Sequence, residues 1–309
     1  MISGITTFCF AASYAVALAL EATRLWFRSG VRSAVMLGFA GAGLLAHTLY
    51  LYQRASEAHE TPLSSSYDWH LLAAWLLVGI YLYLTYYHPR AAIGLFLLPL
   101  VLALIGAAQL ASREPLDTAP AARIWGIVHA AFLLLGTVSV IVGFVAGAMY
   151  LIQAHRLKKK LPPPARLRLP SLEWLQGVNE RALVISVLMI GFGVLAGAVL
   201  NAVQHRQLPW SDPTVWSSAA MFGWLLAAAL FSGFYKPARQ GRKVAYLTVV
   251  SFLFLVISLS VLLLVDTEHG SGTGTGGRRS RISSAPLTVR ALRDRRLSPA
   301  VVHWAISLS

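Results

Sequence analysis

The chain of 309 residues is 57% hydrophobic and only 12% charged, and its mean hydropathy is +0.63. This composition excludes a soluble globular protein, because too few polar side chains are present to cover its surface, and it predicts an integral membrane protein. The formal net charge of +14 is then expected to come from basic loops on the cytoplasmic side of the membrane, without a nucleic-acid partner.

Eight apolar segments are each about as long as a membrane crossing requires, which is roughly 20 residues of helix for about 30 Å of hydrocarbon. In chain order they are residues 5–27, 33–53, 69–87, 91–111, 125–154, 182–203, 216–235 and 244–265. The sequence therefore predicts an all-α fold, a polytopic membrane helix bundle of about eight transmembrane helices. No basic residue precedes the first segment and seven more follow it, so no cleavable signal peptide is predicted.

The loops alternate in charge, which predicts the orientation in the membrane. Basic side chains follow the first, third, fifth and seventh segments: Arg24, Arg28, Arg32, His88, Arg90, Arg156, Lys158, Lys159, Lys160, Lys236, Arg239, Arg242 and Lys243. The other loops are mostly acidic. Because basic loops stay in the cytoplasm, both termini are predicted to lie outside, in a multi-pass protein of the bacterial inner membrane.

One segment between the fifth and sixth apolar runs follows three consecutive prolines and does not read as a span. Ser171 is typical of a helix N-cap, and Leu172, Leu175 and Val178 follow at helical spacing. We expect a short amphipathic helix at residues 171–180 on the cytoplasmic surface, with a structured linker as the alternative.

Three parts of the chain are predicted from these patterns. Residues 1–65 hold the first two helices and an outer loop, and residues 66–270 form the main transmembrane domain. Residues 271–309 form a glycine- and arginine-rich tail that is expected to be disordered. A basic tail outside departs from the charge rule, so it is interpreted either as a reading frame that runs past the natural end or as a partner-binding arm.

Because the chain has a single cysteine, Cys9, any metal or cofactor must depend on histidine. His129 lies one helical turn below the outer boundary of the fifth segment, among apolar residues. Histidine is rare there unless it has a partner or a task. It is either hydrogen-bonded across helices or an axial ligand of haem iron through one ring nitrogen. His47, in the outer half of the second segment, and His205, in a polar loop, could serve the same chemistry.

Residues 204–216, QHRQLPWSDPTVW, form a tryptophan-rich loop between the sixth and seventh segments. Tryptophans at membrane interfaces are usually anchors. This loop, however, combines Trp210, Asp212 and Trp216 within a short stretch. Flat aromatic side chains can lie against a porphyrin face, and the Arg206 guanidinium can pair with a propionate.

Two GxxxG spacings lie in the fifth and sixth segments, Gly143 with Gly147 and Gly193 with Gly197. Small residues at this spacing let two helices approach closely. We expect packing within the chain, which would fix the distance between His129 and the tryptophan-rich loop.

These features resemble the polytopic cytochrome c assembly proteins that handle haem at the outer membrane face, the CcsA or WWD-domain family, including its HemX-like branch. The resemblance covers roughly residues 65–270. It is carried by WGIVHAAFLLLGTVSVIVGFVAGAMYLIQ, LPSLEWLQGVNERALVISVLMIGFGVLAGAV, LPWSDPTVWSSAAMFGWLLAAALF and VSFLFLVISLSVLLLVDTEHG.

The resemblance implies that His129 and His269 are the axial ligands of the haem iron, and that the tryptophan-rich loop lies against haem. The chain departs from the fuller family pattern in two places. The loop is shortened to SDPTVW without the following acidic residue, and FYKPAR stands where the family has a further membrane histidine. Both departures favour the HemX-like branch.

The function that follows is the handling or presentation of haem at the extracytoplasmic face during c-type cytochrome biogenesis, with haem b bound transiently and non-covalently. We expect an assembly factor more than an enzyme, although it could be a non-autonomous part of a haem lyase complex. The expected partners are a second cytochrome c assembly membrane protein with an extracytoplasmic domain and, indirectly, apocytochrome c.

Two alternatives remain at the level of sequence. One is a HemX-like membrane regulator of haem biosynthesis that controls the level of glutamyl-tRNA reductase through its cytoplasmic surface. The other is a haem exporter, although no span carries a central charged residue of the kind that ion-coupled carriers use.

Overall fold

The computed structural model describes residues 6–23, 30–57, 63–89, 91–114, 120–160, 168–203, 213–234 and 241–264. These residues form eight α-helices, each at one of the predicted apolar segments, and the all-α prediction is confirmed. The helices are α1 (Thr7–Thr23), α2 (Gly30–Glu57), α3 (Ser66–Tyr87), α4 (Gly94–Leu110), α5 (Pro120–Lys158), α6 (Leu172–Val203), α7 (Pro213–Phe234) and α8 (Gly241–Leu264).

Six of these helices are long and apolar enough to cross a membrane. They contain the candidate spans Val31–Glu57, Ser66–Tyr87, Arg123–Lys158, Leu172–Val203, Pro213–Phe234 and Gly241–Leu264. The other two, α1 and α4, are shorter apolar helices of 17 residues each. At about 1.5 Å per residue, each of these two is about 25 Å long, slightly less than the hydrocarbon core of a typical bilayer.

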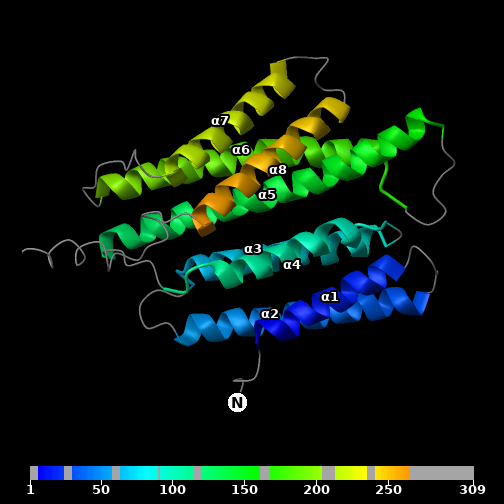
Figure 1. Cartoon of the computed structure of the whole chain (residues 1–309), viewed down its shortest axis with the longest axis horizontal. Helices are drawn as coiled ribbons and strands as arrows, with labels where there is room; N and C mark the ends of the chain where they lie inside the picture. The colour runs from blue at the N-terminus through cyan, green and yellow to red at the C-terminus, as the bar shows by residue number, and fades with distance from the viewer. Residues whose placement is uncertain are drawn as a thin grey trace, which may run out of the picture. The chain divides into compact units, whose positions relative to one another are not determined.

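Successive helices run in opposite directions, as the colours along each ribbon show in Figure 1. Side-chain contacts agree, because residues that advance along α5 meet residues that recede along α6: Leu133 contacts Gly193, and Ala182 lies beside Gly143. We call the end at which α1, α3, α5 and α7 begin the outer end. The predicted basic loops connect helices at the opposite end, and the assignment of the outer end to the extracytoplasmic side stays a prediction.

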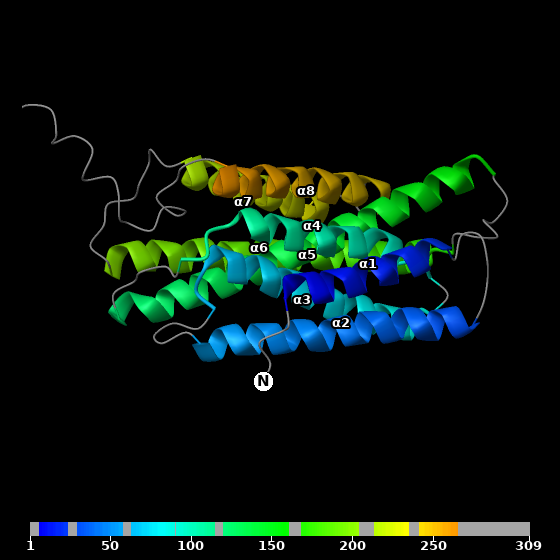
Figure 2. The same cartoon turned by 60° about the horizontal axis from the view of Figure 1, so that its bottom comes forward.

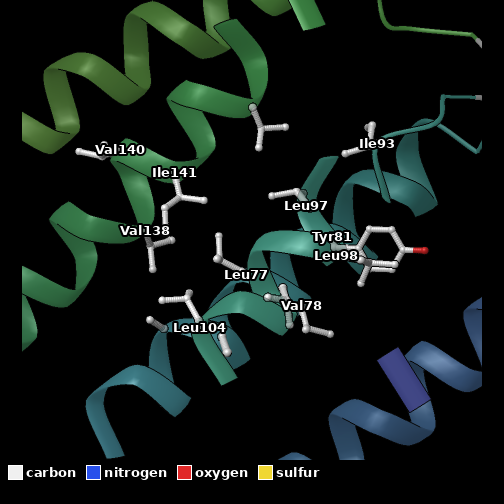
Figure 3. Packing of buried hydrophobic residues seen from close by; sticks show 14 of the residues in the cluster. Leu77, Val78, Tyr81, Ile93, Leu97, Leu98, Leu104, Val138, Val140 and Ile141 are labelled. Carbon is white, nitrogen blue, oxygen red and sulfur yellow. The ribbon is translucent and has the colours of Figure 1, made fainter. Parts of the chain in front are cut away.

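The apolar core joins an N-terminal group of helices, α1 to α4, to a C-terminal group, α5 to α8. In Figure 1, α3 and α4 lie between α1 with α2 and the long helix α5. Figure 2 shows α2 along the lower edge of the bundle, with α7 and α8 on the opposite side. Figure 3 shows the junction, where Leu77 of α3 and Leu97 and Leu104 of α4 point towards Val138 and Ile141 of α5. All five side chains are buried, and this layer holds α5 in place.

A polar cluster ties the outer end of α2 to the start of α3. The Ser65 hydroxyl accepts a hydrogen bond from the Asp68 amide at 3.2 Å, and the Asp68 carboxylate accepts from the Ser65 amide, which completes a capping box. The Arg54 Nε donates to the same carboxylate at 2.6 Å. The guanidinium of Arg54 also lies over the Tyr67 ring, 4.9 Å from its centroid. Asp68, which directly precedes the apolar segment predicted at residues 69–87, therefore fixes the start of α3.

The prediction of a separate helix on the membrane surface at residues 171–180 is wrong, because these residues form the N-cap and the first turns of α6. The N-cap itself is as predicted, since the Trp174 amide donates to the Ser171 hydroxyl at 3.3 Å. No proline interrupts the helix after that point. Leu175 and Asn179 are both fully buried, so the segment packs against its neighbours as part of one continuous helix.

Candidate functional site

The imidazole of His129 lies in the seam between α5 and α6, near the outer end. Its Nδ1 is 2.7 Å from the backbone carbonyl oxygen of Gly193. The ring lies over Gly197, where a Cβ atom would be 2.9 Å from both its Cε1 and its Nδ1. His129 is partly exposed. The cross-helix hydrogen bond that was one of the two interpretations of His129 is therefore present.

The close approach of α5 to α6 depends on glycines of both helices. A Cβ atom at Gly193 would be 2.7 Å from the Leu133 side chain, and one at Gly136 would overlap with Ile190. The predicted packing role of the GxxxG pair in α6 is confirmed.

The GxxxG pair in α5 serves two different helices. Gly143 faces Ala182 of α6, whereas a Cβ atom at Gly147 would be 2.7 Å from the Thr248 hydroxyl of α8. Gly143 therefore contributes to the packing of α5 on α6, and Gly147 to the packing of α5 on α8. The GxxxG spacing alone does not show that the two glycines face different helices.

The hydrogen bond to Gly193 determines which nitrogen of His129 can act as a ligand. A carbonyl oxygen only accepts, so Nδ1 must carry the proton and donate it. In the neutral imidazole the lone pair is then on Nε2, the arrangement found in histidines that bind metals while the second nitrogen is held by an acceptor. The hydrogen bond from Nδ1 to the Gly193 carbonyl thus fits both interpretations of His129, an axial ligand held by an acceptor and a histidine that is hydrogen-bonded across helices.

Trp216, on the first turn of α7, is the one member of the predicted tryptophan and arginine set that the described residues include. Phe222 of α7 packs on Gly191 of α6. Since the two helices are antiparallel, counting six residues outwards on each places Trp216 at about the depth of Gly197. Its side chain is 60% exposed. The other predicted residues, Arg206, Trp210, Asp212 and His269, lie outside the described residues.

Helix α8 approaches the depth of His129 at its outer end. The rings of Phe144 and Phe252 stack with their centroids 4.0 Å apart. Twelve residues farther along each antiparallel helix, Leu264 comes near the level of Phe132, one turn from His129. His269 follows Leu264 by five positions in the sequence.

His47 belongs to a different cluster. Its ring stacks on Phe10 with centroids 4.1 Å apart, and its Nδ1 is 3.3 Å from the Tyr14 hydroxyl. The side chain is fully buried between α1 and α2, and α2 packs mainly on α1 and α3. The structure therefore does not bring His47 together with His129, whose helix packs mainly on α6 and α8. These surroundings favour a packing role for His47.

The described residues contain no group of three or more histidine, cysteine or acidic side chains that could hold a bare metal ion. Sequence reasoning missed two participants in the site, the carbonyl of Gly193 and the lack of a side chain at Gly197, which makes room for the imidazole. The GxxxG spacing is the available signal: it predicts helix packing that fixes the position of His129, but it does not predict a direct contact between these glycines and the imidazole.

Comparison with known proteins identifies the family. Residues 36–268 match the model of the cytochrome C assembly protein family. The chain belongs to this family. It is a multi-pass membrane protein of the cytochrome c biogenesis type, as the resemblance implied, while the HemX-like branch stays a prediction.

Two relatives are both named cytochrome c biogenesis protein CcsA. The protein of Guillardia theta is 24% identical over 226 residues, which cover 66% of this chain and 74% of that protein. The protein of Parasynechococcus marenigrum (strain WH8102) is 24% identical over 270 residues, which cover 79% of this chain and 86% of that protein. No solved structure matches the chain significantly.

Proposed function

We propose that this member of the cytochrome c assembly family binds haem at its outer end and presents it during the biogenesis of c-type cytochromes. The observation that carries the proposal is the Nδ1 hydrogen bond from His129 to the Gly193 carbonyl, which places the lone pair of the neutral imidazole on Nε2, the nitrogen that we assign as the ligand. Haem b is the cargo here, bound transiently and without a covalent bond.

Three features support haem over a packing role alone or a bare metal ion. His129 is only partly buried, as access for a large planar ligand would require. A bare ion would need several ligands close together, and the described residues provide no such group. Trp216 is exposed at a similar depth and offers an aromatic face.

In this proposal His129 and His269 are the axial ligands of the iron. Trp210 and Asp212 belong to a loop that covers the porphyrin together with Trp216 at the start of α7, and the Arg206 guanidinium pairs with a propionate. The assignments of Arg206, Trp210, Asp212 and His269 depend on the sequence motif and on the family.

The proposed chemistry is presentation of haem, and the thioether bonds are made with a partner's help. A single cysteine provides no dithiol pair for reducing the thiols of apocytochrome c. We therefore propose a second assembly membrane protein with an extracytoplasmic domain as the partner, in a bacterial inner membrane. Deletion of the gene is expected to diminish covalent haem staining of c-type cytochromes, and undiminished staining would contradict a role in assembly.

The direct test is the absorption spectrum of the protein purified in detergent, with and without added haem. We expect a Soret band that is lost or shifted in His129→Ala. His155→Ala is the matched control, because His155 is exposed at the other end of α5. If haem neither copurifies nor gives a Soret shift that depends on His129, the proposed site is wrong.

A regulatory role at the opposite end is the second candidate. Residues 171–180 extend α6 beyond its apolar segment, and Trp174 packs edge-on against His88 with ring centroids 4.7 Å apart. The Ala92 amide also donates to the Arg168 carbonyl at 2.9 Å. These contacts build an ordered surface at the predicted cytoplasmic end. A HemX-like regulator predicts an altered glutamyl-tRNA reductase level in the deletion strain, with c-type cytochromes intact.

A further inference from the structure

The imidazole of His129 packs directly on the backbone of α6 at Gly193 and Gly197. We propose that these two glycines are positioning residues of the haem site: Gly197 makes room for the ring, and the Gly193 carbonyl selects Nε2 as the iron ligand. The proposal rests on the proposed function and adds that α6, which supplies none of the proposed ligands, controls the ligand from α5.

The space at Gly197 is needed for the hydrogen bond. An added Cβ atom would be 2.9 Å from two atoms of the imidazole, closer than real Cβ contacts occur. A planar ring cannot bend away in the manner of a long flexible side chain, so the whole ring must rotate or move outwards. Either movement takes Nδ1 out of the 2.7 Å hydrogen bond to Gly193.

The acceptor is held as firmly as the ring. Gly193 packs directly against Leu133 of α5, and a Cβ atom there would be 2.7 Å from the Leu133 Cδ2 and 3.4 Å from its backbone nitrogen. Leu133 lies one turn from His129 on the same helix. The carbonyl of Gly193 therefore stays at a fixed distance from the donor, because the same α5–α6 contact positions both.

The hydrogen bond has a chemical effect as well as a geometric one. A Nδ1–H that donates to a carbonyl makes the imidazole a stronger electron donor through Nε2 and fixes the ring orientation. A stronger axial donor favours ferric over ferrous iron, so the bond is expected to lower the reduction potential of the bound haem. Loss of such a partner typically weakens metal binding roughly 10- to 100-fold.

The first experiment needs no haem. Side-chain ¹⁵N NMR of histidine-labelled protein in detergent, with the His129 signals identified by their loss in His129→Ala, reports which ring nitrogen carries the proton. We expect the Nδ1–H tautomer in the unsubstituted protein and its loss in Gly197→Ala. An Nε2–H tautomer in the unsubstituted protein would overturn the proposal by itself, even if Gly197→Ala did not fold.

The second experiment titrates haem into Gly197→Ala and measures the reduction potential of the complex. Gly126→Ala on α5 and Gly177→Ala on α6 are matched controls, because a Cβ atom at either position would meet nothing within 4 Å. We expect roughly 10- to 100-fold weaker binding and a raised potential in Gly197→Ala alone.

The outcomes separate this proposal from the proposed function. If His129→Ala abolishes haem binding while Gly197→Ala binds haem with unchanged affinity and potential, the function stands and the positioning role is refuted. If haem does not bind through His129, the function fails, and with it the role of the glycines in a haem site, whatever tautomer the NMR shows.

Discussion

Replacement of Asn179 by alanine is expected to destabilise the packing of α5, α6 and α8 by about 2 kcal/mol. The side chain is fully buried on α6. With the amide oriented so that each atom faces a complementary partner, its nitrogen donates to the Gly143 carbonyl at 3.0 Å and to the Thr248 hydroxyl at 2.8 Å. Its oxygen accepts from the Ala245 amide at 3.1 Å. One side chain thus bonds to two neighbouring helices.

The magnitude follows from the number of bonds. Hydrogen bonds that polar side chains make across membrane helices contribute about 0.6 kcal/mol each on average and up to about 1.7 kcal/mol. At that average, the one bond to a side chain and the two bonds to backbone groups sum to about 2 kcal/mol, and the space left by the shorter side chain adds to the loss. Asn179 lies 14 residues from Gly193 along α6, about 21 Å away, so haem binding by the folded protein should be unaffected.

Reversible unfolding in mixed micelles of dodecylmaltoside and SDS, followed by circular dichroism, measures the free energy of unfolding. Asn179→Ala, Thr248→Val and the double variant form a cycle that isolates the bond between the two side chains. We expect a coupling energy between about 0.6 and 1.7 kcal/mol. A loss below about 0.5 kcal/mol in Asn179→Ala, together with no coupling, would refute this account of the junction.

Two further predictions concern the N-terminal group and the α5–α6 seam. Asp68→Asn removes the negative charge of the ion pair with Arg54 and should lower the free energy of unfolding by roughly 2–3 kcal/mol. Glu114→Gln, at an exposed position, should change it little. Gly136→Ala should lower the free energy of unfolding by about 1–3 kcal/mol, because the added Cβ would overlap with Ile190. Gly106→Ala is the control, since its Cβ would meet nothing within 4 Å, and it should leave the free energy of unfolding unchanged or raise it by up to about 1 kcal/mol. Thermal denaturation in detergent checks both pairs, and equal midpoints for the two glycine variants would contradict the overlap.

The sequence was sufficient to locate the helices and to single out His129, because both depend on hydropathy along the chain. An apolar run of about 20 residues is a strong signal, and one imidazole within it stands out. The hydrogen-bond acceptor of that imidazole is 64 positions away, at Gly193. It is also a backbone carbonyl, which every residue possesses, so no residue type in the sequence could mark it.

Contacts between distant segments, which the sequence does not show, also explain why the start of α6 was wrongly predicted to be a separate surface helix. The amphipathic spacing of residues 171–180 is compatible with a helix on the membrane surface and with a helix that packs on protein. Burial of Leu175 and Asn179 by neighbouring helices decides between them, and it depends on contacts between segments far apart in the chain. Hydropathy describes one helix at a time and therefore cannot distinguish a lipid surface from a protein surface.

Comparison of three histidines on apolar helices shows why His129 is the favoured ligand. At His47 the partner of Nδ1 is the Tyr14 hydroxyl, which can donate or accept, so the hydrogen bond does not fix the position of the proton. At His70 the Ser66 carbonyl, 2.8 Å away, fixes it on Nδ1, but the side chain is only 6% exposed and a porphyrin could not reach Nε2 without moving a helix. His129 combines a fixed proton with a residue that is partly exposed. A ligand that must take up and release haem requires both properties, since the first orients the lone pair and the second admits the cargo.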